Sequence, residues 1–182
     1  MTAPEKQPIS WTDIETGSLR LAKMIQDHCR TTGESFDKML VIPRGGYYPA
    51  SIIARVLGFE ASDLLHACIT SYAAGQTERG KTFSYGQMPK KADIAGRHLL
   101  VIEEMCDTGH TLAELMRWLK KAGAKQVRTG VLHYKPNRSQ TDFRPDWWAE
   151  ETDKWVVYPG EQYEINSADS SVRRQLSDAA AA

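Results

Sequence analysis

One segment of this 182-residue chain constrains its fold more than any other, because an apolar run leads through acidic residues directly into an amphipathic helix. The run Leu99–Ile102 has the length and composition of a buried strand, and Thr111–Ala122 carries leucines at helical spacing on one side. Gly123 follows as a stop signal. A strand that passes through a short polar turn into a helix is a building block of parallel α/β sheets.

The rest of the chain repeats this alternation of short apolar runs with helical patterns. It predicts an α/β fold with a mostly parallel sheet flanked by helices, in which ligands bind beyond the carboxyl ends of the strands. Helices are expected from Trp11 to about Gly33 and over 48–57, and further strands over 39–42, 66–72, 127–134 and 155–158.

Charge and cysteine content exclude several classes of protein. The 23 basic and 23 acidic residues balance, which argues against a nucleic-acid partner, and three scattered cysteines suit neither a disulfide scaffold nor a zinc site. No segment approaches the roughly 18 apolar residues of a membrane span. Residues 1–10 have no apolar core typical of a signal peptide, and we expect them to be a flexible N-terminus of a cytoplasmic protein.

The turn between the strand and the helix has the composition of a phosphate-binding site. Backbone N–H groups at a helix N-terminus attract a phosphate, and Thr108 and Thr111 add hydroxyl donors. Glu103 and Glu104 suit sugar hydroxyls or a hydrated Mg²⁺. The alternative is an ordinary helix cap with solvated acids, which explains the cap but not three acids close together.

The segment Val101–Leu112 resembles the phosphoribosyl-pyrophosphate (PRPP) motif of type I phosphoribosyltransferases, in which two acids and two variable residues precede Asp-Thr-Gly-x-Thr. It departs from the motif in two ways: the acid pair contains no Asp, and His110 stands where Lys, Gly or Ser is frequent. The resemblance implies that Glu103 and Glu104 bind the ribose hydroxyls and Mg²⁺, partly through water, and that Asp107 takes a proton from the base. The residues that it implies for the 5′-phosphate are Asp107, Thr108, Gly109, His110 and Thr111.

A second segment, Val41–Ala50, resembles the pyrophosphate loop of the same family. The resemblance implies that Arg44, Gly45 and Gly46 bind pyrophosphate and that the Pro43–Arg44 peptide bond is cis. A plain turn between a strand and a helix is the alternative.

Two further matches resemble the purine-specific members. Ser71 and Tyr72 open the polar stretch 73–92, which is similar to a mobile loop that closes over the active site, although a surface hairpin would have the same composition. Lys135, at the end of an expected strand, resembles the lysine that reaches O6 of the purine; a solvated strand-end lysine is the alternative.

The segment Asp153–Glu161 resembles the hood that covers the base. The resemblance implies that Trp155 stacks on the purine and that the backbone of Val156 reads its edge, whereas Trp155 could instead be an ordinary core aromatic. Gly160 stands where some relatives have Trp, which leaves the base preference open. Trp147 and Trp148 are interpreted as packing residues.

The resemblance covers about residues 10–165, and residues 11–24 are similar to the first helix of bacterial xanthine–guanine phosphoribosyltransferases. We therefore expect a type I phosphoribosyltransferase domain over 11–166, with a small hood from about 135 to 166 plus the N-terminal segment, and a tail over 167–182. The implied activity makes a purine nucleotide and pyrophosphate from PRPP and a 6-oxopurine, with Mg²⁺, in a homodimer or homotetramer. A non-purine base, or a non-catalytic regulator that senses PRPP or nucleotides, are the alternatives.

Overall fold

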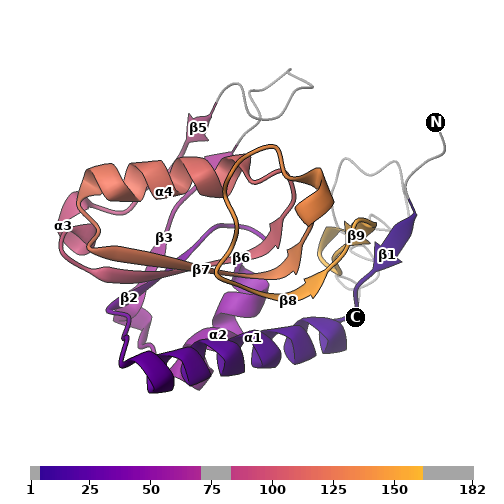
Figure 1. The fold of residues 1–182 in the computed structure, drawn as a ribbon, viewed down its shortest axis with the longest axis horizontal. Coiled ribbons are helices and arrows are strands. Elements are labelled where there is room, and N and C mark those ends of the chain that lie inside the picture. Colours follow the sequence, from indigo (N-terminus) through magenta and orange to yellow (C-terminus); the bar gives the residue numbers. More distant parts are fainter. Residues whose placement is uncertain (1–4, 71–82, 162–182) are drawn as a thin grey trace, which may run out of the picture. The chain divides into compact units, whose positions relative to one another are not determined.

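A five-stranded parallel sheet forms the centre of the computed structural model, which describes residues 5–70 and 83–161 (Figure 1). All neighbouring strands in this sheet run parallel, which confirms the predicted α/β architecture. In spatial order the strands are β3 (Leu64–His66), β2 (Lys38–Val41), β6 (His98–Cys106), β7 (Gln126–Tyr134) and β8 (Trp147–Glu151).

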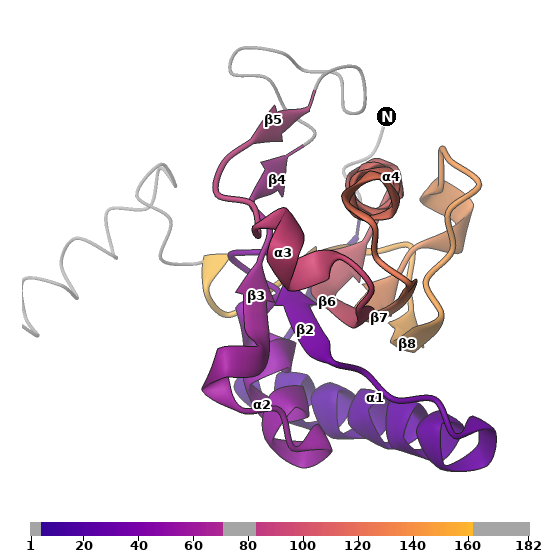
Figure 2. The ribbon, with the colours of Figure 1, turned by 90° about the vertical axis from the view of Figure 1, so that its left-hand side faces the viewer.

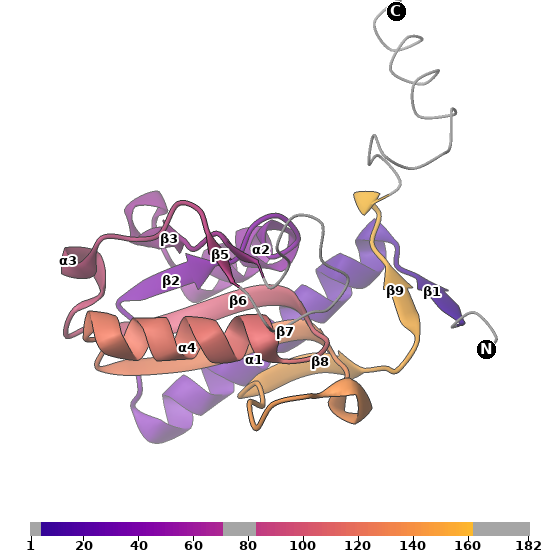
Figure 3. The same ribbon diagram turned by 90° about the horizontal axis from the view of Figure 1, so that it is seen from above.

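Helices cover both faces of this sheet. Figure 2 shows α1 (Trp11–Thr32) and α2 (Tyr47–Leu57) on one face, with α4 (His110–Ala122) on the other. The short helix α3 (Lys91–Ile94) precedes β6, and single 3-10 turns occur at Ala61–Asp63 and Pro136–Arg138. Figure 3, seen from above, shows α4 lying over the sheet.

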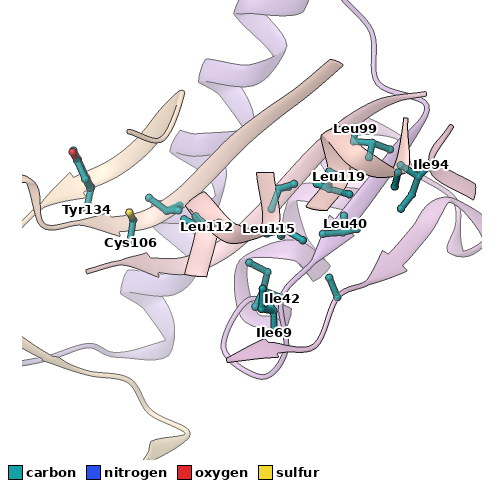
Figure 4. Close-up of a cluster of buried hydrophobic side chains, with 14 residues drawn as sticks. Leu40, Ile42, Ile69, Ile94, Leu99, Cys106, Leu112, Leu115, Leu119 and Tyr134 are labelled. Carbon is teal, nitrogen blue, oxygen red and sulfur yellow. The ribbon is translucent and has the colours of Figure 1, made fainter. Parts of the chain in front are cut away.

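Strand alternation divides the core into two layers of side chains. Leu99 and Val101 of β6 join the cluster under α4, whereas Leu100 and Ile102 join the cluster between the sheet and the helices α1 and α2. Leu112, Leu115 and Leu119 of α4 fill the first cluster (Figure 4). Trp147 lies in the second cluster, which confirms its interpretation as a packing residue.

Glycines end the helices where the sequence pattern predicted. Gly33, Gly58 and Gly123 all have positive φ angles, between 74° and 92°. Gly58 and Gly123 are the C-caps of α2 and α4, and the N–H of Gly33 donates to the carbonyl of Cys29. Only glycine adopts this left-handed conformation without steric cost, so the positions of these glycines determine where the helices end.

The segment 66–72 is the clearest difference from the predicted strands. The strand in the main sheet ends at His66, and a separate strand β4 (Ile69–Thr70) pairs antiparallel with β5 (Ser84–Tyr85). The prediction of one continuous strand was therefore wrong. The polar stretch 73–92, expected as a loop, contains β5 and the start of α3 in its described part.

The chain divides into two compact units, one of which is Ile14–Asp153. The other contains β1 (Lys6–Pro8) and β9 (Trp155–Val157), which form a two-stranded parallel sheet of their own. The sequence predicted β9 but expected no strand within residues 1–10. No helix in the described part of the chain is both long and apolar enough to span a membrane.

Candidate functional site

The expected binding segments lie at the carboxyl ends of adjacent parallel strands. Residues 43–46 follow β2 and Asp107 follows β6, whereas Glu103 and Glu104 lie within β6, which continues beyond the predicted run Leu99–Ile102 to Cys106. Val41, near the end of β2, is in register with Ile102 of β6, and Cys106 at the end of β6 is in register with Tyr134 of β7. The polar residues that follow these strands therefore meet at one edge of the sheet, where ligands of α/β proteins bind.

The first segment, Pro43–Gly46, is called the Arg44 loop here. Its Pro43–Arg44 peptide bond is cis, as the resemblance implied. The carbonyls of Arg44 and Gly45 accept hydrogen bonds from Tyr47 and Tyr48 at 3.2 and 2.9 Å, so the loop turns directly into α2. A Cβ atom on Gly46 would overlap the carbonyl oxygen of Ile42, which explains why glycine is needed at this position.

The second segment is the acid pair. Glu103 is buried, and its Oε1 accepts a hydrogen bond from the backbone N–H of Glu104 at 2.9 Å. Burial, together with the negative charge of Glu104, raises the pKa of Glu103 well above its usual range. The carboxylate of Glu104 lies against Gly45, where a Cβ atom would overlap it. The acid pair is thus in contact with the Arg44 loop.

The donor set of this pair fits a magnesium ion. Mg²⁺ is bound in proteins by one or two carboxylates, with waters and substrate phosphates completing its shell. A cation here would also relieve the electrostatic cost of two adjacent carboxylates, one of which is buried. Within residues 5–70 and 83–161, no group of three or more His, Cys, Asp or Glu side chains is arranged to hold a metal ion.

The third segment is the turn Asp107–Gly109, which leads into α4. Gly109 is the N-cap of α4 with φ +82°, and its carbonyl accepts the first helical hydrogen bond from Ala113 at 2.9 Å. Thr108 is buried and His110 and Thr111 begin the helix. This places the five residues expected to bind the 5′-phosphate on one turn at a helix N-terminus, where backbone N–H groups favour an anion.

Asp107 has a partner that sequence reasoning missed. Nε of Arg138 donates to Oδ1 of Asp107 at 2.6 Å, and Nη2 lies 3.5 Å from Oδ2. Nothing in the composition links these two positions. The order of the strands could have suggested the pair, because Asp107 and Arg138 follow the carboxyl ends of β6 and β7, which are neighbours in the sheet.

Lys135 is buried, which contradicts its alternative interpretation as a solvated strand-end lysine. Its backbone N–H donates to the carbonyl of Cys106 at 3.0 Å, so it lies beside the end of β6. Cys106 is itself buried, and this burial raises the pKa of its thiol to about 12.

Trp155 and Val156 lie in the smaller unit, on β9. The Trp155 side chain is 47% exposed, whereas Val156 is buried, so Trp155 is not a core aromatic. The backbone N–H of Trp155 donates to the carbonyl of Glu5 at 2.8 Å, which ties it to the chain beside β1. Ser71 and Tyr72 lie outside the described residues.

Comparison with known proteins matches this chain over most of its length. The phosphoribosyl transferase domain model matches residues 10–164. A xanthine-guanine phosphoribosyltransferase of Desulfotalea psychrophila is 29% identical over 156 residues, which are 84% of each chain.

Solved structures share the fold. A purine phosphoribosyltransferase from Pyrococcus horikoshii has a TM-score of 0.71 and 24% identity, covering 91% of this chain and 99% of its own. A protein of Neisseria gonorrhoeae solved with bound ppGpp has a TM-score of 0.72 and 20% identity, covering 99% of each chain.

Proposed function

This chain belongs to the phosphoribosyl transferase domain family, and on that premise we propose that it makes a purine nucleotide and pyrophosphate from PRPP and a 6-oxopurine base. The observation that carries the proposal is the meeting of the Arg44 loop, the acid pair and the Asp107 turn at one sheet edge. Together these segments offer a cation and backbone amides, two carboxylates, and a helix N-terminus. PRPP carries a pyrophosphate, a ribose with two free hydroxyls, and a 5′-phosphate.

Each part of PRPP corresponds to one segment in this proposal. Arg44, Gly45 and Gly46 bind the pyrophosphate, since an arginine and close-approaching backbone amides suit a multiply charged anion. Glu103 and Glu104 hold the ribose hydroxyls as hydrogen-bond acceptors. The Asp107 turn and the start of α4 bind the 5′-phosphate through Thr108, Gly109, His110 and Thr111.

The reaction in this proposal is a displacement at C1 of the ribose. A ring nitrogen of the base forms the new bond to C1, the C1–oxygen bond breaks, and pyrophosphate leaves with the bonding electrons. Asp107 accepts the proton that leaves N7 of the base, so no charge accumulates on the purine. Mg²⁺, when bound, neutralises charge on the pyrophosphate. Holding both reactants in line supplies much of the rate enhancement.

Base recognition in this proposal comes from three residues. Lys135 reaches O6 of the purine, Trp155 stacks on its ring, and the backbone of Val156 reads its edge. The exposure of Trp155 supports the stacking role, because an aromatic face that is half open to solvent can accept a planar ligand. The Desulfotalea relative is a xanthine-guanine phosphoribosyltransferase and the Pyrococcus protein a purine phosphoribosyltransferase, which supports a purine as the base.

A panel of bases tests the proposal directly. The purified protein is mixed with PRPP and Mg²⁺, and hypoxanthine, guanine, xanthine, adenine, uracil and nicotinate are added singly. Nucleotide and pyrophosphate are then measured together. Turnover with at least one 6-oxopurine is expected. If only uracil or nicotinate were turned over, the proposed reaction would stand but its base would not be a purine.

A nucleotide-sensing regulator is the second candidate function. The Neisseria protein solved with ppGpp supports it, because that protein covers nearly the whole of this chain. The balanced charge of 23 basic and 23 acidic residues argues against a nucleic-acid target for such a regulator. Tight binding of ppGpp or PRPP, without turnover of any base in the panel, would favour this candidate.

A further inference from the structure

Arg138 and Asp107 form an asymmetric ion pair. The Arg138 Nε to Asp107 Oδ1 distance is 2.6 Å, whereas Nη2 to Oδ2 is 3.5 Å. The side chain of Asp107 is only 14% exposed, compared with 45% for Arg138. A planar guanidinium that meets a carboxylate in this way fixes its orientation as well as adding charge attraction. The short contact anchors one carboxylate oxygen.

The turn that contains Asp107 is held in place by other contacts as well. The backbone N–H of Gln140 donates to the carbonyl of Thr108 at 2.9 Å, and its side-chain Oε1 lies 3.2 Å from Nε2 of His110. A Cβ atom at Gly109 would overlap Oγ1 of Thr141, so this segment packs closely on the turn. The backbone of the turn therefore does not depend on Arg138.

We propose that Arg138 is a positioning residue for proton transfer, which acts by fixing the carboxylate of Asp107 through Oδ1. This inference rests on the proposed function, in which the N7–H bond of the base breaks and its proton moves to Asp107. Such a transfer requires a heavy-atom separation of about 2.6–3.2 Å. When this short contact is lost, the carboxylate of Asp107 is held less firmly and spends less time within that range, and a misplacement of about 1 Å costs up to about 100-fold in rate.

The test compares Arg138→Met, Arg138→Lys, Asp107→Asn and the double variant Asp107→Asn/Arg138→Met in steady-state kinetics. Arg138→Met is expected to lower kcat by about tenfold or more while the KM for PRPP changes by less than about twofold. Arg138→Lys is expected to recover part of the loss, since it keeps the charge but not the planar fork. The double variant is expected to be no slower than Asp107→Asn alone, because both substitutions act through the same carboxylate.

Arg144→Met is the matched control, since Arg144 is an exposed arginine nearby in sequence whose guanidinium lies 4.7 Å from the ring centroid of Trp148. It should leave both kinetic constants unchanged. The inference would be overturned if the rate losses of Asp107→Asn and Arg138→Met multiplied in the double variant. It would also be overturned if Arg138→Met raised the KM for PRPP and left kcat unchanged. Absence of turnover by the unmodified protein would instead overturn the proposed function, and the positioning role with it.

Discussion

The carboxylate of Glu104 packs against the Cα of Gly45, leaving no room for even a methyl group on that glycine. This contact joins the Arg44 loop to strand β6, at positions almost 60 residues apart in sequence. It places the residue proposed to hold ribose hydroxyls beside the loop proposed to hold pyrophosphate. A change at either position is therefore expected to disturb both.

Substitution of the two adjacent glycines should separate an effect on ligand binding from an effect on folding. A Cβ atom at position 45 meets the end of a flexible side chain, which can move, so Gly45→Ala should fold normally and weaken PRPP binding by displacing Glu104. A Cβ atom at position 46 meets the backbone carbonyls of Ile42 and Ile102, so Gly46→Ala should lower the free energy of unfolding by about 1–3 kcal/mol.

Calorimetric titration with PRPP and thermal unfolding of both variants check this contrast. The double variant Gly45→Ala/Glu104→Ala removes the overlap and serves as the control for stability. If Gly45→Ala bound PRPP as tightly as the unmodified protein, the contact would have no role in the site.

Asp107→Asn should separate binding from chemistry. Asparagine keeps the size of the side chain but cannot accept a proton, so kcat should fall by about 100-fold or more while the Kd for PRPP is retained. Rapid-quench measurement of a single turnover alongside PRPP binding checks this. Unchanged turnover would remove Asp107 from the proton-accepting role.

Trp155→Ala should affect the base much more than PRPP. Base–aromatic stacking contributes about 1–3 kcal/mol, so the KM for the purine should rise about tenfold or more. Trp11→Ala is the control, because Trp11 is an even more exposed tryptophan, for which no base contact is proposed. Equal changes in the KM for both substrates would contradict the stacking role.

Glu34 should make stability depend on pH in the acid range. Arg128 donates to both of its carboxylate oxygens at 3.1 and 3.2 Å, and His28 Nε2 lies 3.0 Å away. These contacts, with Arg128 the strongest, lower the pKa of Glu34. The resulting stabilisation is complete well above the usual glutamate pKa of about 4.3 and is lost as the pH falls through the lower folded-state value.

Glu34→Gln should therefore lower the free energy of unfolding by about 1–2 kcal/mol at pH 7, and the difference should shrink toward pH 3. Urea unfolding of the variant and the unmodified protein at a series of pH values measures this difference in the free energy of unfolding. Asp27→Asn, which removes a surface ion pair with Lys23, should cause no measurable change. A difference between Glu34→Gln and the unmodified protein that stays constant down to pH 3 would contradict the assignment.

Elements whose own residues carry a strong signal were predictable from the sequence. The apolar runs Met39–Val41 of β2 and Leu99–Ile102 of β6 are buried, and α4 is bounded by Gly109 and Gly123. β8 was missed as a strand, although its tryptophans were correctly assigned to packing. It lies at the sheet edge, and Glu150 and Glu151 break the apolar pattern.

Local sequence patterns could not predict which distant segments of the chain pair with one another. The run at 155–157 reads as a strand, but only the folded chain shows that its partner is Lys6–Pro8, three residues without a strand signal. The ion pair between Asp107 and Arg138 is missed for the same reason. The segments around Arg44 and Glu103 could be proposed from the sequence because the residues that characterise each of them are consecutive.

The pairing of β1 with β9 has a practical consequence for handling this protein. Lys6 is in register with Trp155 and Pro8 with Val157, so the first residues of the chain brace the strand that carries the proposed stacking tryptophan. A two-stranded sheet has little stability of its own, and among residues 5–70 and 83–161 no third strand joins β1 and β9. Removing the residues before Ser10 would therefore take away the pairing partner of the strand that is proposed to bind the base.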